Sequence, residues 1–169
     1  MAEGSASNGT TQLYLLRHAD AGDPEAWTGA DDVRPLSAKG EKQARRLGEF
    51  LAERGFEPGA IVTSPKTRAR QTAQIVADSL GLEIAIDDRL AGGLDAVAIE
   101  AILFDAGDPE RPLLVGHDPD FSDLTAWITG GSSIAVKKGA LVRLDTVRPI
   151  SQASGTLRWL VPPDLLRGR

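Results

Sequence analysis

Both histidines of this chain directly follow short apolar runs. His18 comes after Arg17 in TQLYLLRHADAG (residues 11–22), and His117 comes after RPLLVG (residues 111–116). Apolar runs of this length are typical of buried strands, so each histidine is expected where a strand ends. An imidazole beside an arginine can bind an anion or attack an electrophile. One such pair alone more often begins a solvated loop, and a lone histidine is more often structural.

A third candidate lies in TSPKTRARQTA (residues 63–73). A strand is expected to end at Thr63, and a helix is expected to begin with Ser64 and with Pro65 in its first position. Arg68 then falls in the first or second helical turn, where it can point toward the same edge as the histidines. Two arginines, two histidines and helix N-termini at one edge indicate a phosphate site.

These four side chains predict phosphoryl-transfer chemistry. Guanidinium groups such as Arg17 and Arg68 match phosphate oxygens and stay charged, and a neutral imidazole can attack phosphorus and carry the phosphoryl group covalently. The chain has no cysteine and only two histidines, which argues against a zinc site. No segment reads G-x-x-x-x-G-K-[ST], so side chains would hold the phosphate. We expect no metal and no cofactor.

Strand-like and helix-like segments alternate along the chain. This order predicts an α/β fold, a three-layer sandwich with a mostly parallel central sheet, helices on both faces and a C-terminal antiparallel hairpin. Ligands in such sheets bind outside the carboxyl ends of the strands, where both histidines fall. Strands are expected at residues 12–16, 60–64, 82–86, 111–116, 139–145 and 155–161, and helices between 37 and 55 and at 66–80, 95–107 and 120–130.

Two helices carry clear boundary signals. Ser37 is a plausible N-cap and Gly55 a plausible stop for the first helix. Asp120 is expected to cap the last helix, and Gly130 is expected to end it.

Composition limits the class of protein. Apolar residues make up 41% and charged residues 25% of 169 residues, as in an ordinary globular domain. The net charge of -5 argues against a nucleic-acid or anionic-membrane surface as the main partner. No apolar run approaches the roughly 20 residues that span a bilayer. We expect a cytoplasmic monomer with a flexible leader at residues 1–10 and one domain at 11–165.

Four segments occur along the chain in one order: LYLLRHAD, RPLSAKGEKQARRLGEFL, IVTSPKTRARQTAQIV and LLVGHDPDFSDL. In this order they resemble the histidine phosphatase superfamily (the phosphoglycerate mutase-like or RHG proteins), and the match covers most of residues 12–145. Within the superfamily, the short chain and the segments DDVRPLSAKG and KKGALVRLD are most similar to the SixA-type phosphohistidine phosphatases.

The resemblance implies a role for each of the four residues. His18 would be the nucleophile that becomes phosphorylated, Arg17 and Arg68 would bind the phosphoryl oxygens, and His117 would stabilise the transition state. The choice of His18 over His117 as nucleophile depends on the resemblance alone.

The chain departs from the family pattern at two positions. Ala19 replaces the usual glycine, which is acceptable where φ is negative. Alignment through Leu90 puts Gly92 where many relatives keep a glutamate that protonates the leaving group. SixA-type proteins resemble this chain in lacking it. An imidazole leaving group needs less acid assistance than an alkoxide, so a protein phosphohistidine is the expected substrate.

Asp20 is the carboxylate nearest to the nucleophile in sequence. It is a candidate general acid or orienting group, and equally a loop-capping aspartate. Asp88 and Asp95 are weaker candidates.

Other charged residues have simpler explanations. Arg34 could reach the rim of the site but is expected to pair with Asp31 or Asp32. Lys66 and Arg70 are expected to be solvated. Lys137 and Lys138 precede the last hairpin and could bind an acidic partner, although exposed lysines usually bind nothing specific.

Three functions remain open at this point. The first is a phosphatase that acts on a phosphohistidine-bearing protein through an open site, since only 49 positions separate Arg68 from His117. The second is a small-molecule phosphomonoesterase, for example one acting on a sugar phosphate. The third is a non-catalytic phosphate-binding module, which would not need the nucleophile His18.

Overall fold

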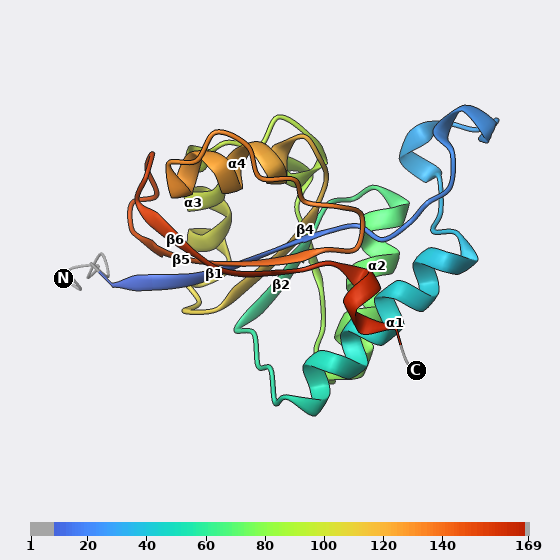
Figure 1. Ribbon diagram of the computed structural model, residues 1–169, viewed down its shortest axis with the longest axis horizontal. Coiled ribbons are helices and arrows are strands. Elements are labelled where there is room, and N and C mark those ends of the chain that lie inside the picture. Colours follow the sequence, from blue (N-terminus) through green and yellow to red (C-terminus); the bar gives the residue numbers. More distant parts are fainter. Residues whose placement is uncertain (1–8, 168–169) are drawn as a thin grey trace.

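Six strands form one sheet in the computed structural model, which describes residues 9–167 (Figure 1). The spatial order of the strands is β3 (Ala85–Ile86), β2 (Ala60–Thr63), β4 (Pro112–Gly116), β1 (Thr10–Arg17), β5 (Leu141–Val147) and β6 (Gly155–Val161). The central strand β1 is parallel to β4 on one side and antiparallel to β5 on the other. β3 and β6 are the edges, and the register of β6 on β5 is irregular between Arg143 and Leu144.

Helices cover both faces of this sheet, so the predicted three-layer α/β architecture is confirmed (Figure 1). The longer helices are α1 (Ala38–Glu53), α2 (Thr67–Leu80), α3 (Ala96–Asp105) and α4 (Asp120–Thr129). Short 3₁₀ turns are η1 (Pro24–Ala26), η2 (Asp31–Val33), η3 (Asp88–Ala91) and η4 (Pro163–Leu166).

Alternation along the strands divides the core into two layers. Leu13 and Leu15 of β1 face the layer of α3 and α4, whereas Tyr14 and Leu16 face the layer of α1 and α2. Burying one large aliphatic side chain completely contributes about 1.5–3 kcal/mol. The central strands are covered on both faces, which explains their uninterrupted apolar sequences.

Helix boundaries follow the sequence at some ends and not at others. The Ser37 side chain accepts a hydrogen bond from the Gly40 N–H and caps α1 as predicted, and Gly130 ends α4 in the left-handed conformation. The prediction that Ser64 and Pro65 begin α2 is wrong, because Lys66 is its N-cap and Thr67 its first residue. Ser64 lies before the helix, where its hydroxyl accepts a hydrogen bond from the N–H of Lys66 at 3.2 Å and contacts a histidine described below.

The N-terminus of α4 is also different from the prediction. Pro119 is the N-cap, and Asp120 is the first helical residue. The Asp120 carboxylate instead accepts a hydrogen bond from the backbone N–H of Leu94, which ties α4 to the segment before α3.

The observed elements extend one residue past each expected limit of the domain, 11 and 165. Residues 1–8 of the expected leader lie outside the described part of the chain, and Thr10 already belongs to β1. At the other end, η4 continues to Leu166, one residue past the expected limit. Within residues 9–167, no helix has the length and apolarity needed to cross a membrane.

Candidate active site

The strand register brings the predicted residues to one edge of the sheet. Arg17, the last residue of β1, is paired with Gly116, the last residue of β4, and Thr63 of β2 is paired with Val115. The residues that follow these strands, His18, Ser64 and His117, therefore emerge side by side. The expectation that both histidines lie at the carboxyl edge is confirmed.

Three neighbouring elements fix the backbone around His18. Its N–H donates to the carbonyl of Gly116, and its own carbonyl accepts from the N–H of Gly139 at 2.9 Å. The next N–H, that of Ala19, donates to Oγ1 of Thr72 on α2 at 3.1 Å. His18 is 5% exposed, so its ring has little freedom to reorient.

Hydrogen bonding defines which ring nitrogen of His18 is free. Nδ1 lies 2.8 Å from the carbonyl oxygen of Ala19, and a carbonyl can only accept, so Nδ1 carries the proton. Nε2 then keeps its lone pair. Burial lowers the pKa of His18 to about 4, with a further contribution from the charges of Arg68 and Arg17, although the bond to Ala19 opposes the shift. His18 is thus a neutral imidazole at pH 7.

His117 lies against His18, with 5.3 Å between ring centroids. Its Nε2 is 2.7 Å from Oγ of Ser64. Burial, followed by the effects of His18 and Arg68, lowers the pKa of His117 to about 3. Both histidines are therefore uncharged near neutral pH, and a negatively charged group between them would favour their protonated forms.

Each arginine is held by partners at one end of its guanidinium group. Nη1 of Arg17 donates to the carbonyl of Val136 at 2.9 Å and to the carboxylate of Asp118 at 3.3 Å. Both Nη atoms of Arg68 donate to Asp31, one to its carbonyl and one to its carboxylate at 2.9 Å. These contacts orient two permanent positive charges close to His18.

Buried polar atoms that lack a partner are concentrated in this site. Within the described residues, the only such side-chain atoms are Nε of Arg17, Nε of Arg68 and Nδ1 of His117. Buried donors and acceptors are nearly always paired, so each exception needs an explanation. Three unpaired nitrogens around one neutral histidine can bind the oxygens of a phosphoryl group.

Asp20 is placed as a structural cap. Its carboxylate accepts hydrogen bonds from Oγ of Ser37 at 2.5 Å and from the N–H of Gly22 at 3.3 Å. Burial alone would raise the pKa of Asp20, but these hydrogen bonds and the charges of Lys138 and Lys39 hold it below its usual value. The Asp20 carboxylate is thus ionised and already hydrogen-bonded, so it is poorly suited to donate a proton.

The remaining carboxylate candidates also have structural partners or lack a side-chain contact. Asp95 caps α3 by accepting from the N–H of Ala98, and Asp88 begins η3. Gly92 ends η3 and has no side chain to replace the family glutamate.

The structure also describes the secondary candidates. Arg34 is buried and pairs with Asp31, as expected. Ala19 has the expected negative φ, since Asp108 and Ala153 are the only non-glycine residues with positive φ within residues 9–167. Lys66 departs from the expectation of a solvated side chain, because it forms an ion pair with Asp32 at 3.6 Å.

Sequence reasoning missed several residues that support the site. The sequence pattern predicts only a helix cap at Ser64, although its position after β2 places it at the same edge as the histidines. Asp118 orients Arg17, and Thr72 anchors the backbone after His18. In the part of the chain that the structure describes, His, Asp and Glu side chains form no cluster of three that could hold a metal ion.

Several known proteins are similar to this chain. Residues 13–92 match the model of the histidine phosphatase superfamily (branch 1). An uncharacterised protein of Picosynechococcus sp. is 34% identical over 79% of this chain and 84% of its own length. A Serratia proteamaculans protein named probable phosphoglycerate mutase GpmB is 36% identical over 59% of this chain, which spans only 46% of that protein.

Two solved structures share the fold over nearly the whole chain. The protein histidine phosphatase SixA, complexed with tungstate, has a TM-score of 0.80 and 25% identity, and the match covers 93% of this chain and 100% of SixA. The α-ribazole phosphatase of Shigella flexneri has a TM-score of 0.69 and 19% identity, with coverage of 90% and 97%.

Proposed function

The chain belongs to the histidine phosphatase superfamily, and on this basis we propose that it removes phosphoryl groups from phosphohistidine on a protein, through an intermediate formed on His18. The observation that carries the proposal is the set of three unpaired buried nitrogens on Arg17, Arg68 and His117 around a neutral His18. Likeness to a protein histidine phosphatase of similar length supports the choice of substrate.

The first step is a displacement at phosphorus. Nε2 of His18 attacks, a P–N bond to His18 forms, and the bond to the leaving group breaks. Arg17 and Arg68 balance the charge on the equatorial oxygens. The carbonyl of Ala19, which accepts from Nδ1, stabilises the positive charge that develops on the phosphorylated ring. His117 supplies its free Nδ1 to the phosphoryl group.

The second step is hydrolysis of this intermediate. Water attacks phosphorus, the P–N bond to His18 breaks, and inorganic phosphate leaves with the ring again neutral. In a phosphohistidine substrate, the ring nitrogen that does not carry phosphorus can be protonated. The substrate's histidine ring then departs in the first step as a neutral imidazole. Such a leaving group takes no proton from the enzyme, which fits a site whose nearest carboxylate, Asp20, is already hydrogen-bonded.

A small-molecule phosphomonoesterase is the second candidate. It is favoured by the resemblance to proteins named phosphoglycerate mutase and by the shared fold of an α-ribazole phosphatase. Such a substrate needs a proton donor, and the carboxylates of Asp20 and Asp95 already accept hydrogen bonds from structural partners.

Phosphate release from three substrates tests the proposal. A histidine-phosphorylated phosphotransfer domain, p-nitrophenyl phosphate and a sugar phosphate are compared, with His18→Ala as the control. We expect the protein phosphohistidine to be lost fastest. His18→Ala should abolish this loss and also the acid-labile phosphate label on the enzyme. Preference for the sugar phosphate would establish the second candidate instead. Phosphate binding without turnover of any substrate would indicate a binding module.

A further inference from the structure

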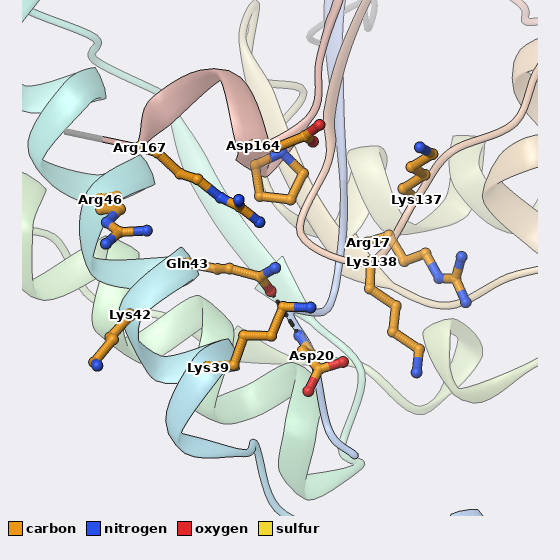
Figure 2. A pocket seen from close by; sticks show the side chains of 11 residues that line it. Arg17, Asp20, Lys39, Lys42, Gln43, Arg46, Lys137, Lys138, Asp164 and Arg167 are labelled. Carbon is orange, nitrogen blue, oxygen red and sulfur yellow. Dashed lines mark hydrogen bonds between the residues drawn. The ribbon is translucent and has the colours of Figure 1, made fainter. Parts of the chain in front are cut away.

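A groove of about 820 Å³ opens beside His18 and is lined mainly by cations. Its walls are one side of α1, the turn at residues 137–139 and η4 (Figure 2). Arg17 belongs both to this groove and to the phosphate site. Only two carboxylates, Asp20 and Asp164, also line it.

The positive charge of this groove is not neutralised within the protein. Among residues 9–167, eight lysines and arginines form no ion pair with a described carboxylate, and six of these eight line the groove. A chain with a net charge of -5 thus concentrates its free positive charge at one place. The six are Lys39, Lys42, Arg46, Lys137, Lys138 and Arg167, and the two outside the groove are Arg70 and Arg111.

The groove is fixed relative to the nucleophile. The N–H of Gly139 donates to the carbonyls of both Arg17 and His18, so the turn that carries Lys138 is attached to the catalytic loop. From the opposite wall, Oε1 of Gln43 on α1 accepts from the N–H of Asp20 at 2.9 Å (Figure 2). After burial and the two arginines, the charge of Lys138 also contributes to the lowered pKa of His18.

We propose that this groove docks an acidic face of the protein that carries the phosphohistidine. The inference rests on the proposed function and adds the chemistry of the partner's surface. Small anions are usually held by a few buried, converging groups, whereas Lys39, Lys42 and Lys137 are exposed on flexible stems. Exposed charges spread over three segments fit a broad acidic surface, which they attract over long range.

Charge reversal with a matched control tests this docking. Lys39→Glu/Arg46→Glu alters the groove, and Arg70→Glu/Arg111→Glu makes the same change in net charge elsewhere. The probes are a histidine-phosphorylated phosphotransfer domain with Asp and Glu around its histidine and the same domain with those residues changed to Asn and Gln. For each enzyme, kcat/KM is measured at low and high salt and divided by kcat/KM for p-nitrophenyl phosphate.

The groove variant should lose about tenfold in this ratio for the acidic domain at low salt, and little at high salt. The amide-substituted domain should be a poorer substrate for the wild type and should not respond to the groove variant. The control variant should behave as the wild type. Lys39→Gln/Arg46→Gln, with its smaller charge change, should show a smaller loss in the same direction, and circular dichroism verifies that each variant is folded.

Other results would overturn the inference in distinguishable ways. If the groove variant and the control variant turn over the acidic and the amide-substituted domain equally well, the groove has no docking role. The proposed phosphohistidine phosphatase activity would still stand. A different result would assign the groove to a small polyanion. In that case tripolyphosphate inhibits the wild type but not the groove variant, and the groove substitutions leave turnover of both domains unchanged. Hydrolysis of p-nitrophenyl phosphate with turnover of neither domain would overturn the proposed function and the docking together.

Discussion

The reactivity of His18 depends on which ring nitrogen carries the proton. The carbonyl of Ala19 holds the proton on Nδ1, and burial beside two arginines keeps the ring from gaining a second one. The same burial keeps His117 neutral. An anion placed between the two rings would favour their protonated forms and so oppose the effect of burial.

Titration of the two histidines by NMR tests this description. Because the chain has two histidines, His117→Gln assigns both ring signals. We expect apparent pKa values near 4 for His18 and near 3 for His117 in the free enzyme. Inorganic phosphate should raise at least one of them, since an opposite charge favours the protonated form. Titration of both rings near 6.5 would contradict the assigned burial.

A second residue-level prediction concerns Asp20. Asp20→Asn should retain most phosphatase activity, because the carboxylate is hydrogen-bonded to Ser37 and ionised. The substitution should lower the free energy of unfolding by about 1 kcal/mol through loss of charge-assisted bonds. Measuring kcat on p-nitrophenyl phosphate and the urea midpoint separates the two effects. A loss of about 10²-fold or more in kcat would restore Asp20 as a general acid.

At the scale of elements, the N-terminus of α1 approaches the catalytic loop closely. Asp20 accepts hydrogen bonds from the N–H and the hydroxyl of Ser37, and a Cβ at Gly40 would collide with the Asp20 carbonyl oxygen. Gly40 is thus required for the contact between α1 and the loop that begins with His18. The segment that begins α1 thus positions the loop that carries His18.

Gly40→Ala tests this contact. Replacing a helical glycine by alanine ordinarily stabilises a protein by about 0.5–1 kcal/mol. Here the change should destabilise it and also lower kcat, because the loop carrying His18 must shift. Chemical denaturation and kcat on p-nitrophenyl phosphate provide the two readouts. A stabilised and fully active variant would show that the loop can move away freely.

The elements could be predicted from local patterns only where local interactions decide them. The order of strands and helices, the Ser37 cap and the C-terminal hairpin follow from apolar periodicity and turn residues. Ser64 and Asp120 do not lie at the predicted cap positions, and each makes a tertiary hydrogen bond, to His117 and to Leu94, that no local pattern indicates. The ion pair of Arg68 with Asp31 also depends on how the segment before α1 folds back on α2.

For the whole molecule, the buried site makes stability depend on pH. The pKa values of His18 and His117 lie below their ordinary value of 6.5, so the unfolded chain binds more protons between about pH 6.5 and 4. The free energy of unfolding must therefore fall as pH falls through this range. Asp20, Asp31 and Asp145, whose pKa values are lowered from 3.8, lose their contribution only at lower pH.

Urea unfolding at pH 7, 6, 5 and 4 measures this dependence. The slope should approach about 1.4 kcal/mol per pH unit for each proton taken up on unfolding. His18→Gln/His117→Gln should be nearly flat over the same range, while the wild type is not. A wild-type curve that is flat from pH 6.5 to 4 would mean that the histidines are solvated.

The edges of the sheet have a consequence for solubility. β3 pairs with β2 over two residues only, and it therefore presents little free backbone. β6 is the longer edge, but it exposes Arg158 and joins β5 through an irregular register. Short, charged and irregular edges disfavour strand pairing between molecules. We therefore expect little amyloid-like pairing of the edge strands β3 and β6 between molecules, even at high protein concentration.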